Sequence, residues 1–141
     1  MAKFFVDQEK KIMNAQLFDE DALMVAKSFF DTFTDRQGRE KKNMVSSSQL
    51  RRFYNEVKSI EKKLMVDGWA SVFPLVKMLK SKVSYATSRS VVKKVGEEKV
   101  YSRLKEFIID GVNSITDEKD FYAFSKYFEA VVGYYYGEGG K

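Results

Sequence analysis

Residues that break helices are scarce through most of this 141-residue chain. The sequence has one proline and eight glycines, and four of the glycines fall within the last nine residues. No segment alternates strictly between apolar and polar residues and ends at an Asn-Gly or Asp-Gly turn, which is the pattern of a hairpin strand. The sequence therefore predicts an all-α fold, a compact bundle of about five helices.

Apolar residues that recur every three or four positions predict where these helices lie. We expect helices over about residues 19–33, 46–66, 69–89, 97–113 and 117–135. Asp19, the serines at 46–48 and the segment 114–117 offer side chains that can cap helix N-termini. Residues 35–43 are expected to form a loop. Pro74 must lie in the first turn of its helix or mark a kink.

The composition predicts a single folded domain over residues 1–141, with a flexible glycine-rich tail at 137–141. Hydrophobic residues make up 44% of the chain and aromatic residues 15%, enough for one core. Cysteine is absent, which is typical of proteins from a reducing compartment. Asp7 interrupts the apolar start, and no later run approaches 18 apolar residues, so we expect a cytoplasmic protein with no membrane association.

Catalytic chemistry has little support in the sequence. The chain contains no His and no Cys, so it cannot build a Ser-His-Asp triad, a Cys-His pair or a zinc site with imidazole or thiolate ligands. A cluster of three acids at 19–21 is better explained as an acidic helix start than as a metal site. We therefore expect no enzymatic activity, no cofactor and no bound metal.

The most informative charges lie on the second predicted helix. Lys and Arg exceed Asp and Glu to give a net charge of +5 and favour polyanionic partners. Steps of three and four place four polar residues on one stripe that contains no acid: Arg51, Asn55, Lys58 and Lys62. At about 1.5 Å per residue, the stripe is roughly 16 Å long, enough to follow several phosphates. Arg52 and Glu56, four residues apart, are expected to form an ordinary surface pair beside it.

The third predicted helix repeats the arrangement with an aromatic residue between two cations. Met78, Lys82, Tyr85 and Arg89 share one side of this helix at the same spacing. Lysine and arginine can hold phosphates while a tyrosine ring stacks on an unpaired base. Tyr85 could equally pack against a neighbouring helix.

Aromatic residues dominate the last predicted helix, and their spacing indicates a buried face. This face comprises Phe121, Phe124, Phe128, Val131, Val132 and Tyr135. Tyr127, Tyr134 and Tyr136 lie off it and could serve a protein interface or stack on bases.

Three stretches together resemble a known family. They are residues 35–41 (Asp-Arg-Gln-Gly-Arg-Glu-Lys) running into 47–51 (Ser-Ser-Gln-Leu-Arg), residues 79–85 (Leu-Lys-Ser-Lys-Val-Ser-Tyr) with Arg89, and residues 124–134 (Phe-Ser-Lys-Tyr-Phe-Glu-Ala-Val-Val-Gly-Tyr). In order and spacing they resemble the small subunit of type III-A CRISPR effector complexes, the Csm complexes.

The resemblance implies a non-catalytic, RNA-binding structural subunit of an antiviral ribonucleoprotein. Several copies would stack along the guide RNA and target RNA, in contact with one another and with other subunits, while cleavage belongs to those other subunits. Together with the basic stripes, it predicts RNA contacts at Arg51, Lys58, Lys62, Lys82 and Arg89, with weaker candidates at Arg36, Arg39 and Lys41 and base stacking on Tyr85.

Two other functions fit the same residues. The chain could be a helical protein-protein adaptor that binds no nucleic acid and uses its tyrosine-rich last helix as the interface. It could also be a helix-turn-helix regulator of DNA, although the second and third predicted helices are longer than a usual recognition helix.

Overall fold

The computed structural model describes residues 3–9, 11–88, 91–92, 94 and 96–141. The helices are α1 (Glu20–Ser28), α2 (Ser47–Asp67), α3 (Trp69–Ala86), α4 (Glu97–Asn113) and α5 (Glu118–Gly137), with a 3-10 turn, η1 (Ala15–Phe18), before α1. The strands are β1 (Phe5–Asp7), β2 (Ile12–Met13), β3 (Phe30–Thr34) and β4 (Glu40–Met44).

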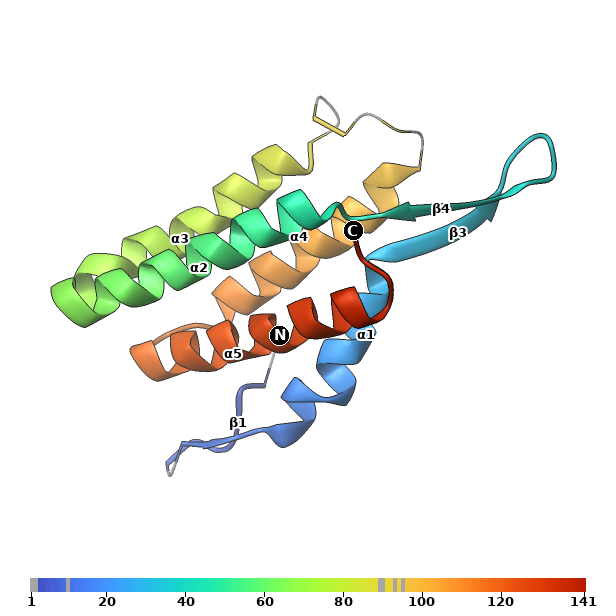
Figure 1. Cartoon of the computed structure of the whole chain (residues 1–141). Coiled ribbons are helices and arrows are strands. Elements are labelled where there is room, and N and C mark those ends of the chain that lie inside the picture. The colour runs from blue at the N-terminus through green and yellow to red at the C-terminus, as the bar shows by residue number, and fades with distance from the viewer. Residues whose placement is uncertain (1–2, 10, 89–90, 93, 95) are drawn as a thin grey trace.

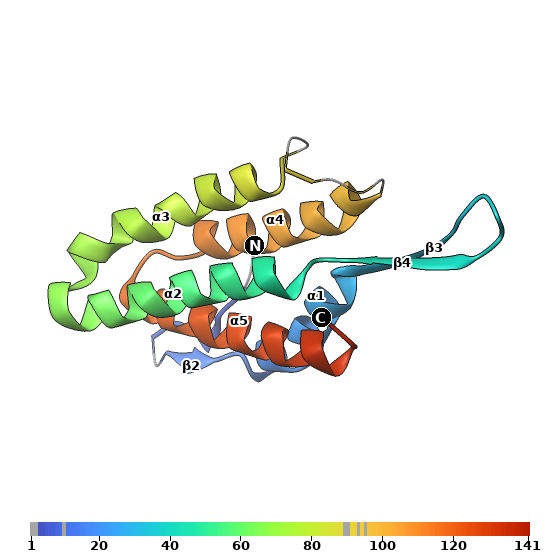
Figure 2. The ribbon, with the colours of Figure 1, turned by 45° about the horizontal axis from the view of Figure 1, so that its top comes forward.

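The four long helices lie side by side, and the β3–β4 hairpin projects beyond them (Figures 1 and 2). α2 packs against α3 and α5, α3 packs against α4, and the shorter α1 packs mainly against α5. Gly68 joins α2 to α3 with a φ of 83°, a left-handed conformation that suits glycine. None of the helices in the described part of the chain is long and apolar enough to cross a membrane.

The helices predicted from residue 46 onward are confirmed, with small shifts at their ends. The Ser46 side chain accepts a hydrogen bond from the Gln49 N–H, and Asp117 accepts one from Asp120, so both predicted N-terminal caps form. Pro74 lies in the second turn of α3, so the first of its two predicted positions is wrong and a kink stays a prediction. The predicted end of this helix at 89 falls outside the described residues.

The prediction of a purely helical fold is wrong between residues 29 and 44. α1 ends at Ser28, and β3 pairs with β4 in an antiparallel hairpin of five residue pairs, from Phe30 opposite Met44 to Thr34 opposite Glu40. The phenylalanines at 29, 30 and 33 continue the helical spacing of α1, which is why a helix was expected. β-branched threonines at 32 and 34 instead favour the extended backbone.

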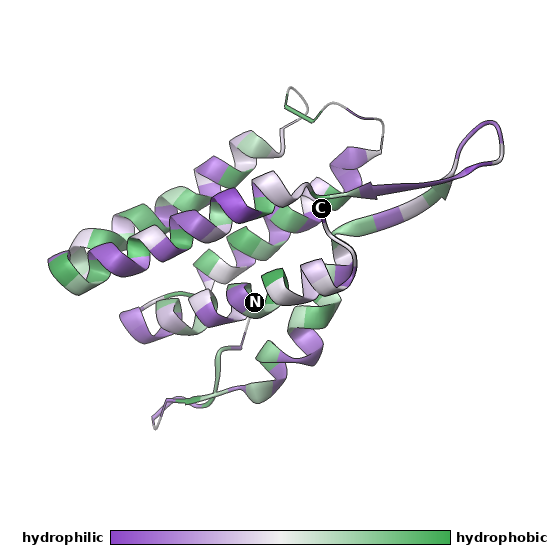
Figure 3. Cartoon of the chain, viewed as in Figure 1, coloured by the Kyte–Doolittle hydropathy of each residue, from purple (hydrophilic) through white to green (hydrophobic). Residues whose placement is uncertain are grey.

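A closed five-residue turn forms the tip of this hairpin, where a loop had been predicted. The Asp35 carboxylate accepts hydrogen bonds from the backbone N–H groups of Gln37 and Arg39, at 3.0 and 2.9 Å. Gly38 has a φ of 78°, which glycine adopts at little cost. Hydrophilic colouring covers most of β4 and the tip in Figure 3, whereas β3 keeps apolar residues, including Phe33, which is 38% exposed.

A second small sheet and the first helix start also differ from expectation. β1 and β2 form a two-stranded antiparallel sheet near the N-terminus, and Phe5 of β1 is buried. Asp19 precedes α1 but makes no side-chain capping bond. Its carboxylate accepts a hydrogen bond from the Tyr134 hydroxyl at 3.1 Å and so ties the start of α1 to α5.

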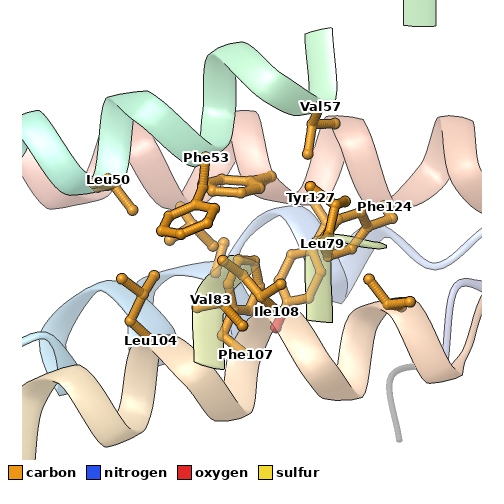
Figure 4. Close-up of a cluster of buried hydrophobic side chains, with 14 of the residues drawn as sticks. Leu50, Phe53, Val57, Leu79, Val83, Leu104, Phe107, Ile108, Phe124 and Tyr127 are labelled. Atoms are coloured by element: carbon orange, nitrogen blue, oxygen red, sulfur yellow. The ribbon is translucent and has the colours of Figure 1, made fainter. Parts of the chain in front are cut away.

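The core lies between the helices and is rich in aromatic rings (Figure 4). The predicted buried face of α5 is confirmed for Phe121, Phe124, Phe128, Val131 and Tyr135, whereas Val132 is only partly buried. Tyr127, predicted to lie off this face, is also buried. Gly111 on α4 lets this face approach closely. A Cβ at position 111 would lie 2.2 Å from a ring carbon of Phe124.

The C-terminal residues return to the start of α2 (Figure 1). The Lys141 carbonyl accepts a hydrogen bond from the Ser47 N–H at 2.8 Å, and the Gly140 N–H donates to the Tyr135 carbonyl. The flexibility proposed for residues 137–141, like the single-domain boundary, stays a prediction.

Candidate nucleic-acid interface

Four exposed cations lie along α2, and we call them the basic face of α2: Arg51, Arg52, Lys62 and Lys63. The two arginines lie in the first turns of the helix and the two lysines near its end, so the face spans roughly 16 Å. Within the described part of the chain, none of the four forms an ion pair. Arg51 lies over the Tyr136 ring, with its guanidinium carbon 5.6 Å from the ring centroid, a contact that leaves its hydrogen-bond donors available.

Lys58 lies in the middle of the predicted stripe but is not free of acids, as the sequence had suggested. Its ammonium group lies 3.2 Å from a Glu61 carboxylate oxygen and 3.7 Å from one of Glu129, which reaches over from α5. Partial burial alone would lower the pKa of Lys58, but the hydrogen bond and charge of Glu61, with Glu129, raise it. Lys58 is therefore a charged but partly neutralised member of the surface.

Lys82 is also neutralised, and its partner is the acid on α2 that was predicted to pair with Arg52. The Lys82 ammonium group donates to the Glu56 carboxylate across the α2–α3 interface. The predicted Arg52–Glu56 pair is therefore wrong, because Glu56 bonds to α3 instead. Arg52 and Lys63 consequently join the exposed cations, a result that sequence spacing missed because the acid's partner comes from another helix.

Tyr85 has the exposure that a base-stacking residue needs. Its side chain is 70% exposed on α3, one turn beyond Lys82, and it makes no ring contact with another described residue. The alternative, that Tyr85 packs on a neighbouring helix, does not hold in this chain. Arg89, predicted to complete the same side of the helix, lies outside the described residues.

The three weaker candidates lie on the projecting hairpin, away from the basic face of α2 (Figure 2). Arg36 at the tip and Lys41 on β4 are exposed and have no ion pair within the residues described. Arg39 instead donates to the Asp35 carboxylate at 3.0 Å and to the Gln37 side chain at 3.2 Å. Arg36 and Lys41 are thus the hairpin cations available to bind a phosphate, whereas Arg39 stabilises the turn at the hairpin tip.

The tyrosines of α5 offer less surface to a partner than an adaptor would need. Tyr127 is buried, Tyr134 is half-buried and bonds to Asp19, and Tyr136 is 38% exposed beneath Arg51. Only Tyr122, at the start of the helix, adds an exposed ring. This geometry gives little support to the tyrosine-based interface.

Two further kinds of site remain to be compared with the structure, a metal site and a helix-turn-helix unit. In the described segments, no group of three Asp or Glu side chains is placed to hold a metal ion. α2 and α3 are 21 and 18 residues long and pack against each other as an antiparallel pair, unlike the crossed helices of a helix-turn-helix unit.

The fold and its surface define a class: a small, mostly helical protein with a row of exposed cations on one long helix and a projecting β-hairpin beside it. The family model for Csm2 Type III-A matches residues 26–141, and the chain belongs to this family. It is therefore a subunit of the multi-subunit type III-A Csm complex, in a family whose role there is structural. Comparisons with curated proteins and with solved structures give no match.

Proposed function

We propose that this subunit holds RNA within the Csm complex and does not cut it. Copies of the chain stack along the guide RNA and target RNA and bind their sugar-phosphate backbones. The observation that carries the proposal is the basic face of α2, where four exposed cations have no acidic partner in the described residues. Removing such charges from water would be unfavourable, but phosphates can neutralise them while they stay at the surface.

The candidate residues fall into two groups by their present partners. Four of them can bind phosphates without first breaking an ion pair to a described residue: Arg51 and Lys62 on α2, and Arg36 and Lys41 on the hairpin. Lys58, Lys82 and Arg39 must first release a carboxylate. Exposed ion pairs contribute only about 0.2–1 kcal/mol, so RNA can displace those carboxylates at modest cost. Arg89 is retained as a proposed contact on its sequence spacing from Lys82 and Tyr85 and on the family resemblance.

Binding of this kind reads the backbone and not the base sequence. Lys and Arg contacts to phosphates position a protein on nucleic acid without reporting which base is present. Tyr85 adds a stacking surface, which every base can use. Both kinds of contact are independent of base sequence, as a subunit that binds many different guide RNAs requires.

The test is RNA binding by the purified chain at two salt concentrations. With about four neutralised phosphates and a single-strand slope near −0.7 per contact, affinity should fall roughly fifty-fold between 50 and 200 mM salt. Arg51→Glu should weaken binding and leave the helical circular dichroism unchanged. Lys105→Glu is the matched control, since Lys105 is exposed on α4 and the substitution changes net charge equally.

Three results would count against the proposal. Equal affinities of the Arg51→Glu and Lys105→Glu variants would remove the basic face of α2 as the site. Tighter binding to duplex DNA than to RNA would favour a DNA regulator. Failure to bind RNA both alone and in the reconstituted complex, with normal assembly, would favour the adaptor.

A further inference from the structure

A pocket of about 280 Å³ lies where the start of α2, the end of α3 and the start of α4 meet. Its apolar wall comes from Ala86, the last residue of α3, and from Val91 and Val92 in the segment that follows. A water molecule occupies about 30 Å³ in the liquid, so the pocket is much larger than a site for a single water. It can therefore hold a small organic group.

Gln49 supplies this pocket with a polar atom that lacks a partner. Its side-chain oxygen is buried and accepts no hydrogen bond within the described part of the chain. Buried acceptors in folded proteins are normally paired, because an unpaired one has lost its water and gained nothing in return. The unpaired oxygen indicates that a donor from another molecule belongs in the pocket.

Tyr101 adds a hydrogen-bond donor to the same pocket. Its hydroxyl oxygen accepts a hydrogen bond from the Ser46 N–H at 3.0 Å, and its own O–H donates to no group of the described residues. The two charged side chains of the described lining, Lys94 and Glu97, have opposite signs, so together they add no net charge. The pocket therefore suits a neutral group with both a donor and an acceptor, and not a phosphate or a charged side chain.

The pocket adjoins the surface proposed to bind RNA. The Lys82–Glu56 ion pair shows which side of α2 faces α3. Steps of three and four place Gln49 and Arg52 on that same side, so an exposed cation of the basic face of α2 lies one turn from Gln49. On α3, Ala86 lies one turn beyond Lys82. A strand whose phosphates follow these cations would pass beside the pocket.

We propose that this pocket receives one unpaired base of an RNA strand whose backbone lies on the basic face of α2. The base donates an N–H to the Gln49 oxygen and accepts a hydrogen bond from the Tyr101 hydroxyl. Ala86 and Val92 contact the faces of its ring, as apolar side chains do around other extruded bases. Arg52 binds a neighbouring phosphate. Every RNA base has a donor beside an acceptor on its Watson–Crick edge, so the pocket accepts any of them.

The first experiment titrates the isolated chain with adenosine and follows backbone amide shifts by NMR. A nucleoside has no phosphate, so the basic face of α2 does not contribute to its binding. We expect saturable shifts at residues that line the pocket. The shifts should be much weaker with N6,N6-dimethyladenosine, which keeps the purine ring but has no amino N–H to donate. Equal binding of the two nucleosides, or no saturable binding, would overturn the proposal.

One substitution distinguishes a binding role of Gln49 from a structural one. Gln49→Met keeps the length of the side chain and removes the amide, so it should weaken adenosine binding roughly tenfold, the loss of about one hydrogen bond. The melting temperature should not fall, because the amide oxygen has no partner to lose in the described structure. Gln16→Met, at an exposed position of η1, is the matched control and should bind adenosine normally. A lower melting temperature with unchanged adenosine affinity would overturn the proposal.

This inference rests on the proposed function, and RNA binding shows which of the two fails. Gln49→Met leaves the net charge unchanged, so it should weaken RNA binding severalfold at an unchanged salt slope, whereas Arg51→Glu should reduce the slope. Equal RNA affinities of the Gln49→Met and Gln16→Met variants, with salt-dependent binding intact, would overturn this inference alone. Absence of RNA binding by the parent protein, alone and in the complex, would overturn both.

The second experiment uses the reconstituted complex. Because the sequence contains no cysteine, Lys94→Cys gives this chain a single thiol at the exposed rim of the pocket, which can carry a benzophenone cross-linker. Cross-links to RNA support the proposal. Cross-links only to a protein subunit, or none in a complex that assembles normally, would overturn it, and the first of these results would assign the pocket to a protein side chain.

Discussion

The Tyr135 hydroxyl donates a hydrogen bond of 2.5 Å to the Val45 carbonyl, and both residues are fully buried. Tyr135 lies near the end of α5, and Val45 joins the hairpin to α2. The bond thus links segments 90 residues apart in sequence. It fixes the base of the hairpin to the C-terminal helix, beside the stacked rings of Phe30 and Tyr135.

Removing this hydroxyl should destabilise the fold. Tyr135→Phe retains the ring but leaves the Val45 carbonyl buried without its donor, at a cost of about 1–3 kcal/mol in the free energy of unfolding. Urea denaturation followed by circular dichroism measures the change. Tyr136→Phe, one position along on the surface, serves as the control and should have little effect. A loss of the same size in both variants would contradict the role given to this bond.

Replacement of two glycines by alanine should change the free energy of unfolding in opposite directions. Gly111→Ala places a methyl group against the Phe124 ring and should lower the free energy of unfolding by about 1–3 kcal/mol. Gly133 is exposed within α5 and has open space around it, so Gly133→Ala should raise stability by up to about 1 kcal/mol. Thermal unfolding of the two variants checks both signs. Destabilisation by both would mean that α5 tolerates no side chain at position 133.

Releasing Lys82 should strengthen RNA binding. Glu56→Gln removes the carboxylate that neutralises Lys82 and makes the ammonium group available for a phosphate. We expect tighter binding and a salt dependence steeper by about 0.7 in the log-log slope, the effect of one added contact on a single strand. Glu106→Gln changes net charge equally at an exposed site on α4 and should leave the slope unchanged. Equal slopes in the two variants would place Lys82 outside the RNA contact.

Stability should fall steeply above pH 10 because of two buried tyrosines. Burial raises the pKa values of Tyr127 and Tyr135 to about 12, whereas an unfolded tyrosine titrates near 10. The unfolded chain therefore loses these protons first, and stability that is complete below pH 10 is lost as pH rises toward 12. The loss amounts to roughly 2–3 kcal/mol for each tyrosine.

The Tyr127→Phe variant isolates the contribution of Tyr127 to this loss of stability at high pH. The variant should match the parent protein at pH 8, since the hydroxyl has no hydrogen-bond partner within the described structure, and should lose less stability between pH 10 and 12. Urea midpoints across this range provide the measurement. Parallel pH profiles of the two proteins would show that Tyr127 titrates normally in the folded state.

Sequence patterns were sufficient for α2 to α5 because local signals agree there. Ser46 and Asp117 cap their helices, Gly68 and Gly96 separate them, and the apolar spacing continues between these points. The hairpin was missed because Phe30 and Phe33 fit the helical spacing of α1. Its stability depends on pairing with β4 and on contact with Tyr135, neither of which a local pattern contains.

The candidate interface was predictable in its cations but not in their partners. Spacing placed Arg51, Lys58 and Lys62 on one side of α2. The acids that neutralise Lys58 and Lys82 include Glu129 and Glu56, which reach them from other helices. Such pairs depend on how helices pack, so only the structure could divide the predicted cations into free and neutralised ones.

The β3–β4 hairpin also has a consequence for how the chain meets others. A two-stranded sheet leaves one row of backbone N–H and C=O groups unpaired on each outer side, and such rows readily template the addition of a further strand. On β4 the exposed run Glu40, Lys41 and Lys42 places charges along one of these edges, and charged side chains on an edge strand discourage the pairing of a further strand. The β4 edge is therefore protected against strand addition, and we expect neighbouring molecules in an assembly to contact the side chains of β4 and not its backbone.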